Sequence, residues 1–196
     1  MERNGKCSIK YKRYKNYSLG GRKKVIDLKE KIRNIPNFPA KGIQFKDITT
    51  LLKDKEAFKF SIDEITRHCS KYQIDYIAGI EARGFIIGAP VAYQLGIGFL
   101  PIRKPDKLPS EVEKISYELE YGKNVLEIHK DAIDSGDRIM VIDDLLATGG
   151  TTAAVFKLIE KLEGKVVGAT FIIELAFLNP REKLKEYDIF SLVYYN

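Results

Sequence analysis

The sequence has few of the residues on which many protein classes depend. Only two of its 196 residues are cysteines, Cys7 and Cys69, which lack metal-ligand spacing and are too few for a disulfide framework. This cysteine usage indicates a reducing compartment, and we expect a cytoplasmic protein. No apolar run reaches the ~18 residues that a membrane-spanning helix needs, so no membrane partner is expected. The two histidines, His68 and His129, receive no catalytic role.

The net charge of +6 comes from one end of the chain. Residues 1–24 hold nine of the 33 Lys and Arg residues but only one of the 27 acidic residues, which leaves 24 basic and 26 acidic residues elsewhere. We therefore interpret residues 1–26 as a basic N-terminal extension without fixed structure and residues 27–196 as one domain. A basic tail can also contact nucleic acid or a membrane surface, or act as a targeting segment. The domain itself carries no electrostatic footprint for nucleic acid.

Apolar strand-like segments alternate with segments of helical periodicity. The expected strands are 74–80, 96–103, 114–122, 124–130, 137–143, 165–175 and 188–193. The expected helices are 27–35, 54–72, 85–95 and 149–162, and residues 180–187 are expected to form a helical turn. Residues 36–47 are expected to form a loop, and Gly122 and Lys123 a turn. This order predicts an α/β fold with a mostly parallel central sheet flanked by helices, which binds ligands beyond the carboxyl ends of its strands.

The segment VIDDLLATGGTTAA, residues 141–154, combines two acids with bare backbone. It is neither a GxxxxGK[ST] loop nor a GxGxxG motif. The strand ends on Asp143 and Asp144, which can accept hydrogen bonds from sugar hydroxyls or help to place Mg²⁺. Gly149 and Gly150 open a helix whose first N–H groups lack internal partners and attract phosphate. A phosphorylated ribose fits both halves, although a strand, a turn and a threonine-capped helix would give a similar pattern.

This segment resembles the phosphoribosyl-pyrophosphate (PRPP) motif of type I phosphoribosyltransferases. Other stretches are similar to the adenine-specific members of that family: IPNFPAKGIQFKDITTLL, IAGIEARGFIIGAPVAYQLGIGFLPIRK, SYELEYG, LEIHKDAI and FSLVYY. The resemblance spans residues 28–195 in order. It implies the family fold with a small N-terminal hood and a flexible catalytic loop, and a homodimer. The implied reaction belongs to purine salvage: adenine and PRPP give AMP and pyrophosphate in the presence of Mg²⁺.

The resemblance assigns the ribose phosphate to the segment 141–154. Asp143 and Asp144 would hold the ribose 2′- and 3′-hydroxyls, and Leu145 would pack on one face of the purine. The 5′-phosphate would lie in a loop formed by Ala147, Thr148, Gly149, Gly150 and Thr151. No residue is expected to bind Mg²⁺ directly, because PRPP would carry the ion.

Glu81, Ala82 and Arg83, in the segment EARG, match the family's pyrophosphate loop. Main-chain N–H groups and the guanidinium of Arg83 would hold the pyrophosphate leaving group. The family often has a cis peptide bond here, which we expect between Glu81 and Ala82. A surface ion pair between Glu81 and Arg83 is the plainer interpretation. Further basic residues would neutralise phosphate charge, partly across a dimer interface, or form a solvated loop: Arg103, Lys104 and Lys107.

Two more segments complete the implied site. GIQFKD would read adenine largely through main-chain groups at Gln44, with Lys46 beside it and Phe45 stacked on the ring, although Phe45 can also be a core aromatic. In SYELEYG, Glu120 is the expected general base that takes a proton from the purine. Tyr121 would cover the pyrophosphate when the loop closes and excludes water. The alternating polar residues of SYELEYG also suit a solvated strand face.

Two other functions are compatible with the sequence. A phosphoribosyltransferase for 6-oxopurines or orotate would share the PRPP site but differ in the base segment. A PRPP-sensing regulator that binds nucleic acid would need an N-terminal winged-helix domain, and the 26 residues before the fold are too few for one. We therefore expect adenine, PRPP, AMP and pyrophosphate as ligands, and no nucleic acid.

Overall fold

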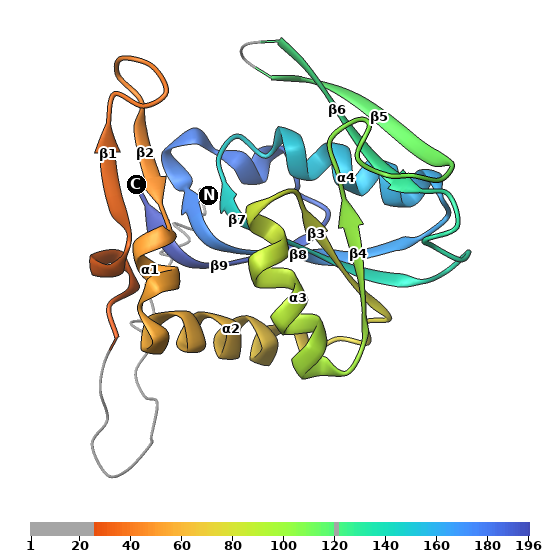
Figure 1. The fold of residues 1–196 in the computed structure, drawn as a ribbon, viewed down its shortest axis with the longest axis horizontal. Helices are drawn as coiled ribbons and strands as arrows, with labels where there is room; N and C mark the ends of the chain where they lie inside the picture. Colours follow the sequence, from red (N-terminus) through yellow and green to blue (C-terminus); the bar gives the residue numbers. More distant parts are fainter. Residues whose placement is uncertain (1–25, 120–121) are drawn as a thin grey trace, which may run out of the picture.

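A five-stranded parallel sheet with the strand order β4-β3-β7-β8-β9 forms the centre of the molecule (Figure 1). The computed structural model describes residues 26–119 and 122–196 of the chain. The sheet strands are β3 (Tyr76–Ile80), β4 (Gly98–Ile102), β7 (Arg138–Leu146), β8 (Lys165–Leu175) and β9 (Asp188–Tyr195). The expected α/β fold with a mostly parallel sheet is confirmed.

Helices cover both faces of this sheet. They are α1 (Thr49–Lys53), α2 (Lys55–Cys69), α3 (Arg83–Leu95) and α4 (Gly150–Lys161). Short 3-10 turns are η1 (Leu28–Lys31), η2 (Ala176–Leu178) and η3 (Pro180–Lys183). None of the helices in the described part of the chain has the length and apolar character to cross a membrane.

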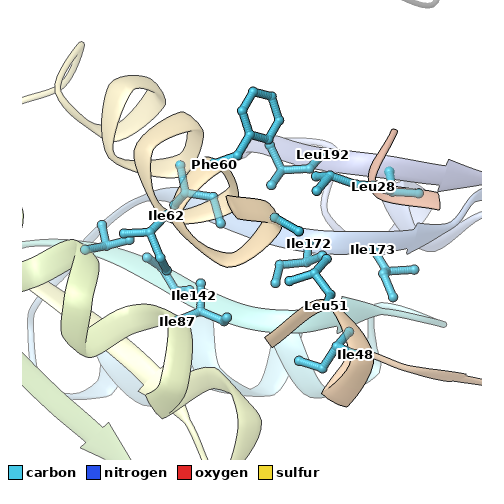
Figure 2. Packing of buried hydrophobic residues seen from close by; sticks show 14 of the residues in the cluster. Leu28, Ile48, Leu51, Phe60, Ile62, Ile87, Ile142, Ile172, Ile173 and Leu192 are labelled. Carbon is cyan, nitrogen blue, oxygen red and sulfur yellow. The ribbon is translucent and has the colours of Figure 1, made fainter. Parts of the chain in front are cut away.

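Alternate residues of β7 point to opposite faces and so build two cores. Met140 and Ile142 pack with α1, α2 and α3 in the first core, whereas Ile139 and Val141 pack with α4 in the second. Figure 2 shows Ile142 in the first core together with buried residues of α2 and α3. The sheet is therefore covered on both faces, and a ligand can reach it at the ends of its strands.

Two antiparallel hairpins stand outside the central sheet (Figure 1). The hood consists of β1 (Arg33–Pro36) and β2 (Gln44–Asp47) and lies beside the end of β9, where Lys46 Nζ is 4.1 Å from the Tyr195 ring centroid. The second hairpin consists of β5 (Val112–Leu119) and β6 (Gly122–His129). It contributes Leu126 and Ile128 to the core on the α4 side.

The structure corrects three local predictions. Residues 36–47, expected to be a loop, contain β2, and the helix expected over 27–35 is only η1 followed by β1. Gly122 and Lys123, expected to form a turn, belong to β6 and pair with β5. Four-residue strands with few apolar residues carry little local signal, because their stability comes from cross-strand partners. Of the expected extension, Ile26 packs against the first core and residues 1–25 lie outside the described residues.

Candidate active site

The carboxyl ends of β3 and β7 bring the EARG segment and the two acids together. The pairing of β3 with β7 ends at Gly79 and Ile142, so Glu81 and Asp143 follow at the same edge of the sheet. Helix α3 begins directly afterwards, and its second residue, Gly84, lies against β7. A Cβ atom at Gly84 would stand 2.7 Å from the main-chain oxygen of Ile142. Glycine is therefore required for this close approach of α3 to the acids.

Asp143 and Asp144 form an acid pair that is largely removed from water. Asp144 is buried and Asp143 is partly buried, and the Asp144 N–H donates to Asp143 Oδ1 at 2.9 Å. Burial raises the pKa of both side chains, and the neighbouring charge of Asp144 raises the pKa of Asp143 further. Arg83 Nη1, 3.1 Å from Asp144 Oδ2, offsets part of the rise for Asp144.

The ion pair with Arg83 does not complete the hydrogen bonding of Asp144. Among the residues that the structure describes, Asp144 Oδ2 has no hydrogen-bond partner, although it is buried. Buried polar atoms are nearly always hydrogen-bonded, so an orphaned carboxylate oxygen calls for a donor. A hydroxyl group of a ligand can supply one.

Arg83 also connects the acid pair to the hood. Its Cζ lies 5.4 Å from the ring centroid of Phe45, within the range of a cation–π contact. Phe45 packs edge-on against Phe38, with ring centroids 5.2 Å apart. The hood thus presents an aromatic ring to the same guanidinium that meets Asp144.

The neighbours of Phe45 in β2 use their side chains differently. Gln44 Oε1 accepts a hydrogen bond from Asn34 Nδ2 at 2.7 Å, and Lys46 Nζ donates to Asn34 Oδ1 at 2.9 Å. Successive side chains of a strand point to opposite faces. Gln44 and Lys46 therefore tie β2 to β1, while Phe45 turns toward Arg83.

The EARG loop has the expected cis peptide bond between Glu81 and Ala82. The expected alternative, an ion pair between Glu81 and Arg83, is wrong because Glu81 binds the basic loop instead. Glu81 Oε2 accepts hydrogen bonds from Arg103 Nε at 3.1 Å and from the Lys104 N–H at 3.0 Å. These bonds lower the pKa of Glu81, with the Arg103 side chain the largest cause. Arg103 Nη1 also donates to the main-chain oxygen of Lys107 at 3.0 Å, which fixes the loop.

The loop of residues 147–151 leads into the N-terminus of α4. Gly149 precedes the helix with φ 78°, and a Cβ atom there would meet the main-chain oxygen of Pro180 at 2.6 Å. Within the described residues no side chain caps α4, so the N–H groups of its first turn are available to an anion. Thr151 Oγ1 donates to the hydroxyl of Tyr117 at 3.3 Å, which brings the β5–β6 hairpin to the loop.

The sequence reasoning missed Tyr117. A signal for Tyr117 was its alternation with Ile115, because both pack against the second core whereas Ser116 between them is exposed. Leu145 is partly buried and packs against the first core. Glu120 and Tyr121 lie outside the described residues.

Comparisons with known proteins place the chain in a family. The model of the phosphoribosyl transferase domain matches residues 49–193. The adenine phosphoribosyltransferase of Halothermothrix orenii is 59% identical over 168 residues, which cover 86% of this chain and 99% of the relative. The chain belongs to the adenine phosphoribosyltransferase family. It is an enzyme of purine salvage that transfers a phosphoribosyl group from PRPP to adenine and forms AMP.

Solved structures of adenine phosphoribosyltransferases have the same fold. The crystal structure from Thermoanaerobacter pseudethanolicus is 54% identical, with a TM-score of 0.83 over 85% of this chain and 97% of that one. The structure from Saccharomyces cerevisiae, in complex with an imino-altritol bisphosphate and adenine, is 41% identical. Its TM-score is 0.80 over 84% of this chain and 96% of that one. The expected phosphoribosyltransferase fold with its N-terminal hood is confirmed.

Proposed function

We propose that the stretch from Asp143 to Thr151 binds the two ends of the ribose 5-phosphate unit. The carboxylates accept hydrogen bonds from the 2′- and 3′-hydroxyls, which stabilise the charged form that burial disfavours. The first N–H groups of α4 and the Thr151 hydroxyl donate to the 5′-phosphate. The observation that carries this proposal is the buried acid pair, with its orphaned oxygen on Asp144, followed five residues later by an uncapped helix N-terminus.

In this proposal the hood recognises adenine. Phe45 stacks on the ring, and Leu145 packs on the purine from the PRPP motif. Main-chain groups at Gln44 and Lys46 supply the hydrogen bonds, since the side chains of both residues are bound to Asn34. The S. cerevisiae relative, whose structure contains adenine, supports a purine pocket in this fold.

The leaving pyrophosphate interacts with the EARG loop and the basic loop. Arg83, together with the main-chain N–H group of Ala82, holds its oxygens, and Arg103, Lys104 and Lys107 neutralise its charge. The bond from the anomeric carbon to the pyrophosphate oxygen breaks as the bond from that carbon to adenine N9 forms. Glu120 takes the N9 proton as general base, and Tyr121 covers the leaving group.

Mg²⁺ accompanies PRPP in this mechanism. Within residues 26–119 and 122–196, no group of three or more His, Cys, Asp or Glu side chains is arranged to hold a metal ion. Mg²⁺ keeps several waters and is bound largely through substrate phosphates in such enzymes, so PRPP itself would carry the ion into this site. When bound, the ion neutralises charge on the pyrophosphate.

The active form we propose is a homodimer in the cytoplasm. Ile86 and Tyr93, one face of α3, are 43% and 87% exposed, and this helix starts with the site residue Arg83. A second copy packed on this apolar face would lie next to the pyrophosphate loop. Tyr93→Asp should therefore give a monomer in sedimentation analysis, and an unchanged dimer would contradict this interface. The buried free thiol of Cys69 suits a reducing compartment.

A turnover assay tests the assignment of base and catalyst. The purified chain is offered PRPP and Mg²⁺ with adenine, hypoxanthine, guanine or orotate, and pyrophosphate release is followed with and without each base. We expect pyrophosphate release with adenine only. Comparable release with another base would overturn the proposal that the hood recognises adenine. Glu120→Gln should lower kcat about 100-fold or more, the usual contribution of general base catalysis. A wild-type kcat would remove Glu120 from the mechanism.

A further inference from the structure

Glu174 of β8 and Arg181 of η3 form a two-point ion pair at the same end of the sheet. Arg181 Nε donates to Glu174 Oε1 at 2.8 Å, and Nη2 donates to Oε2 at 2.9 Å. Glu174 is only 2% exposed, and Ser191 Oγ of β9 donates to its Oε2 at 2.7 Å. Both carboxylate oxygens are thus hydrogen-bonded, which is the condition for burying such a charge.

Tyr194 contacts the Arg181 member of this ion pair. Arg181 Nη2 lies 3.4 Å from the Tyr194 hydroxyl, and the guanidinium carbon is 5.9 Å from the ring centroid. The Arg181 head group is therefore held by residues of both β8 and β9. Since Arg181 is the second residue of η3, these contacts fix the position of that turn on the sheet.

Held in this position, the turn η3 packs against the phosphate loop, residues 147–151. Pro180, its first residue, is buried, and its main-chain oxygen lies where a side chain of Gly149 would project. On the strand side, Glu174 pairs in register with Leu146, the residue just before the loop. The ion pair therefore connects β8, which pairs with β7 at the point where β7 enters the phosphate loop, with the turn that packs against Gly149.

We propose that Glu174 and Arg181 are positioning residues for the 5′-phosphate loop. In the proposed mechanism neither touches a substrate, and their effect passes through Pro180 to Gly149 and the first N–H groups of α4. A misplacement of about 1 Å in such a site costs on the order of 100-fold in rate. The inference rests on the proposed assignment of residues 147–151 to the 5′-phosphate.

Glu174→Gln tests the proposal, because it removes the charge and keeps the shape. The matched control is Glu182→Gln in η3 itself, where Glu182 and Lys185 form an exposed ion pair at 2.6 Å. We expect Glu174→Gln to raise the KM for PRPP and the Kd of ribose 5-phosphate about 10-fold, part of the full misplacement effect. The kcat, the KM for adenine and the Kd of pyrophosphate should stay within about 2-fold, and the control should match wild type.

Two outcomes would overturn the proposal. Glu174→Gln could behave like the control, or it could weaken pyrophosphate, adenine and ribose 5-phosphate alike, as a general loss of structure would. If Glu174→Gln does not fold, Arg181→Lys provides the same test, because lysine keeps the charge without the two-point geometry.

Thr151→Val, measured in parallel, separates the inference from the proposed function. Unchanged ribose 5-phosphate binding in Thr151→Val would refute the phosphate assignment itself. Weakened binding in Thr151→Val together with wild-type binding in Glu174→Gln would refute only the positioning role.

Discussion

Replacing Asp143 with asparagine should stabilise the protein while removing most of its activity. Asparagine has nearly the same shape, and its Oδ1 can still accept the hydrogen bond that the Asp144 N–H donates at 2.9 Å. What disappears is a negative charge whose pKa is raised by burial and by the charge of Asp144. The repulsion from Asp144, which contributes to the raised pKa of Asp143, has no counterpart in the variant.

The stabilisation has a defined dependence on pH. Because folding raises the pKa of Asp143 above its ordinary value of 3.8, the wild type loses stability as pH rises through the folded pKa. Each unit of such a rise corresponds to about 1.4 kcal/mol. For a protein of this size, 1 kcal/mol shifts Tm by about 2–4 °C. The Tm of Asp143→Asn should equal that of wild type near pH 4 and exceed it by several degrees at pH 8.

The activity of Asp143→Asn should fall, although its stability rises. A hydrogen bond to a charged group contributes about 1.5–3 kcal/mol, so kcat/KM for PRPP should fall roughly 10- to 150-fold. Calorimetry from pH 4 to 8 and initial rates at pH 8 measure both effects. A Tm difference that is constant or shrinks as pH rises would refute the description of this acid pair.

Two further substitutions test the phosphate loop and the hood. Gly149→Ala places a Cβ atom 2.6 Å from the Pro180 oxygen at a residue with φ 78°, so we expect a loss of about 1–3 kcal/mol in unfolding free energy and a raised KM for PRPP. A wild-type KM would show that the loop tolerates this collision. Asp47→Asn weakens the anchor of β2, where Asp47 accepts hydrogen bonds from the Thr49 N–H at 2.9 Å and Arg33 Nε at 3.0 Å. The Thr49 N–H is the largest cause that lowers the pKa of Asp47, so its stabilisation is lost as pH falls through the folded pKa. Chemical unfolding should show Asp47→Asn about 1–3 kcal/mol less stable at pH 7 and equal to wild type at low pH, and an equal deficit at both would contradict this.

The sequence was informative where function depends on adjacent residues. In the segment 141–154 the acids, glycines and threonines follow one another along the chain, so the sheet edge and the helix start could be predicted together. Local order of this kind indicates local geometry without knowledge of the rest of the fold. In EARG, by contrast, the cis bond between Glu81 and Ala82 was expected from the family resemblance, and it is present.

Partners that come from distant elements could not be predicted. The alternative interpretation of EARG paired Glu81 with Arg83, two residues away, but Glu81 binds Arg103, 22 residues away, because β3 and β4 end next to one another. Arg83 meets Asp144 for a similar reason, since β3 and β7 are neighbours in the sheet. Ion-pair partners are set by strand order, and a single sequence carries no direct record of strand order.

The hood shows a different limit. Its strands are four residues long, and Arg33 and Asp47 pair across the hairpin with only polar side chains at that position. Such segments lack both the alternation and the apolar content that identify strands. Their hairpin is instead held by hydrogen bonds from Asn34 and Arg33 to partners in β2, which only the folded chain brings within reach.

The central claim is that Asp143 recognises the ribose hydroxyls of the ligand. Its most direct test is the affinity of AMP relative to 2′,3′-dideoxy-AMP, measured by calorimetry on the wild type and on Asp143→Asn. We predict that the wild type binds AMP at least about 10-fold more tightly, the value of a charged hydrogen bond, and that this ratio falls toward one in the variant. The same ratio in both proteins would contradict the account.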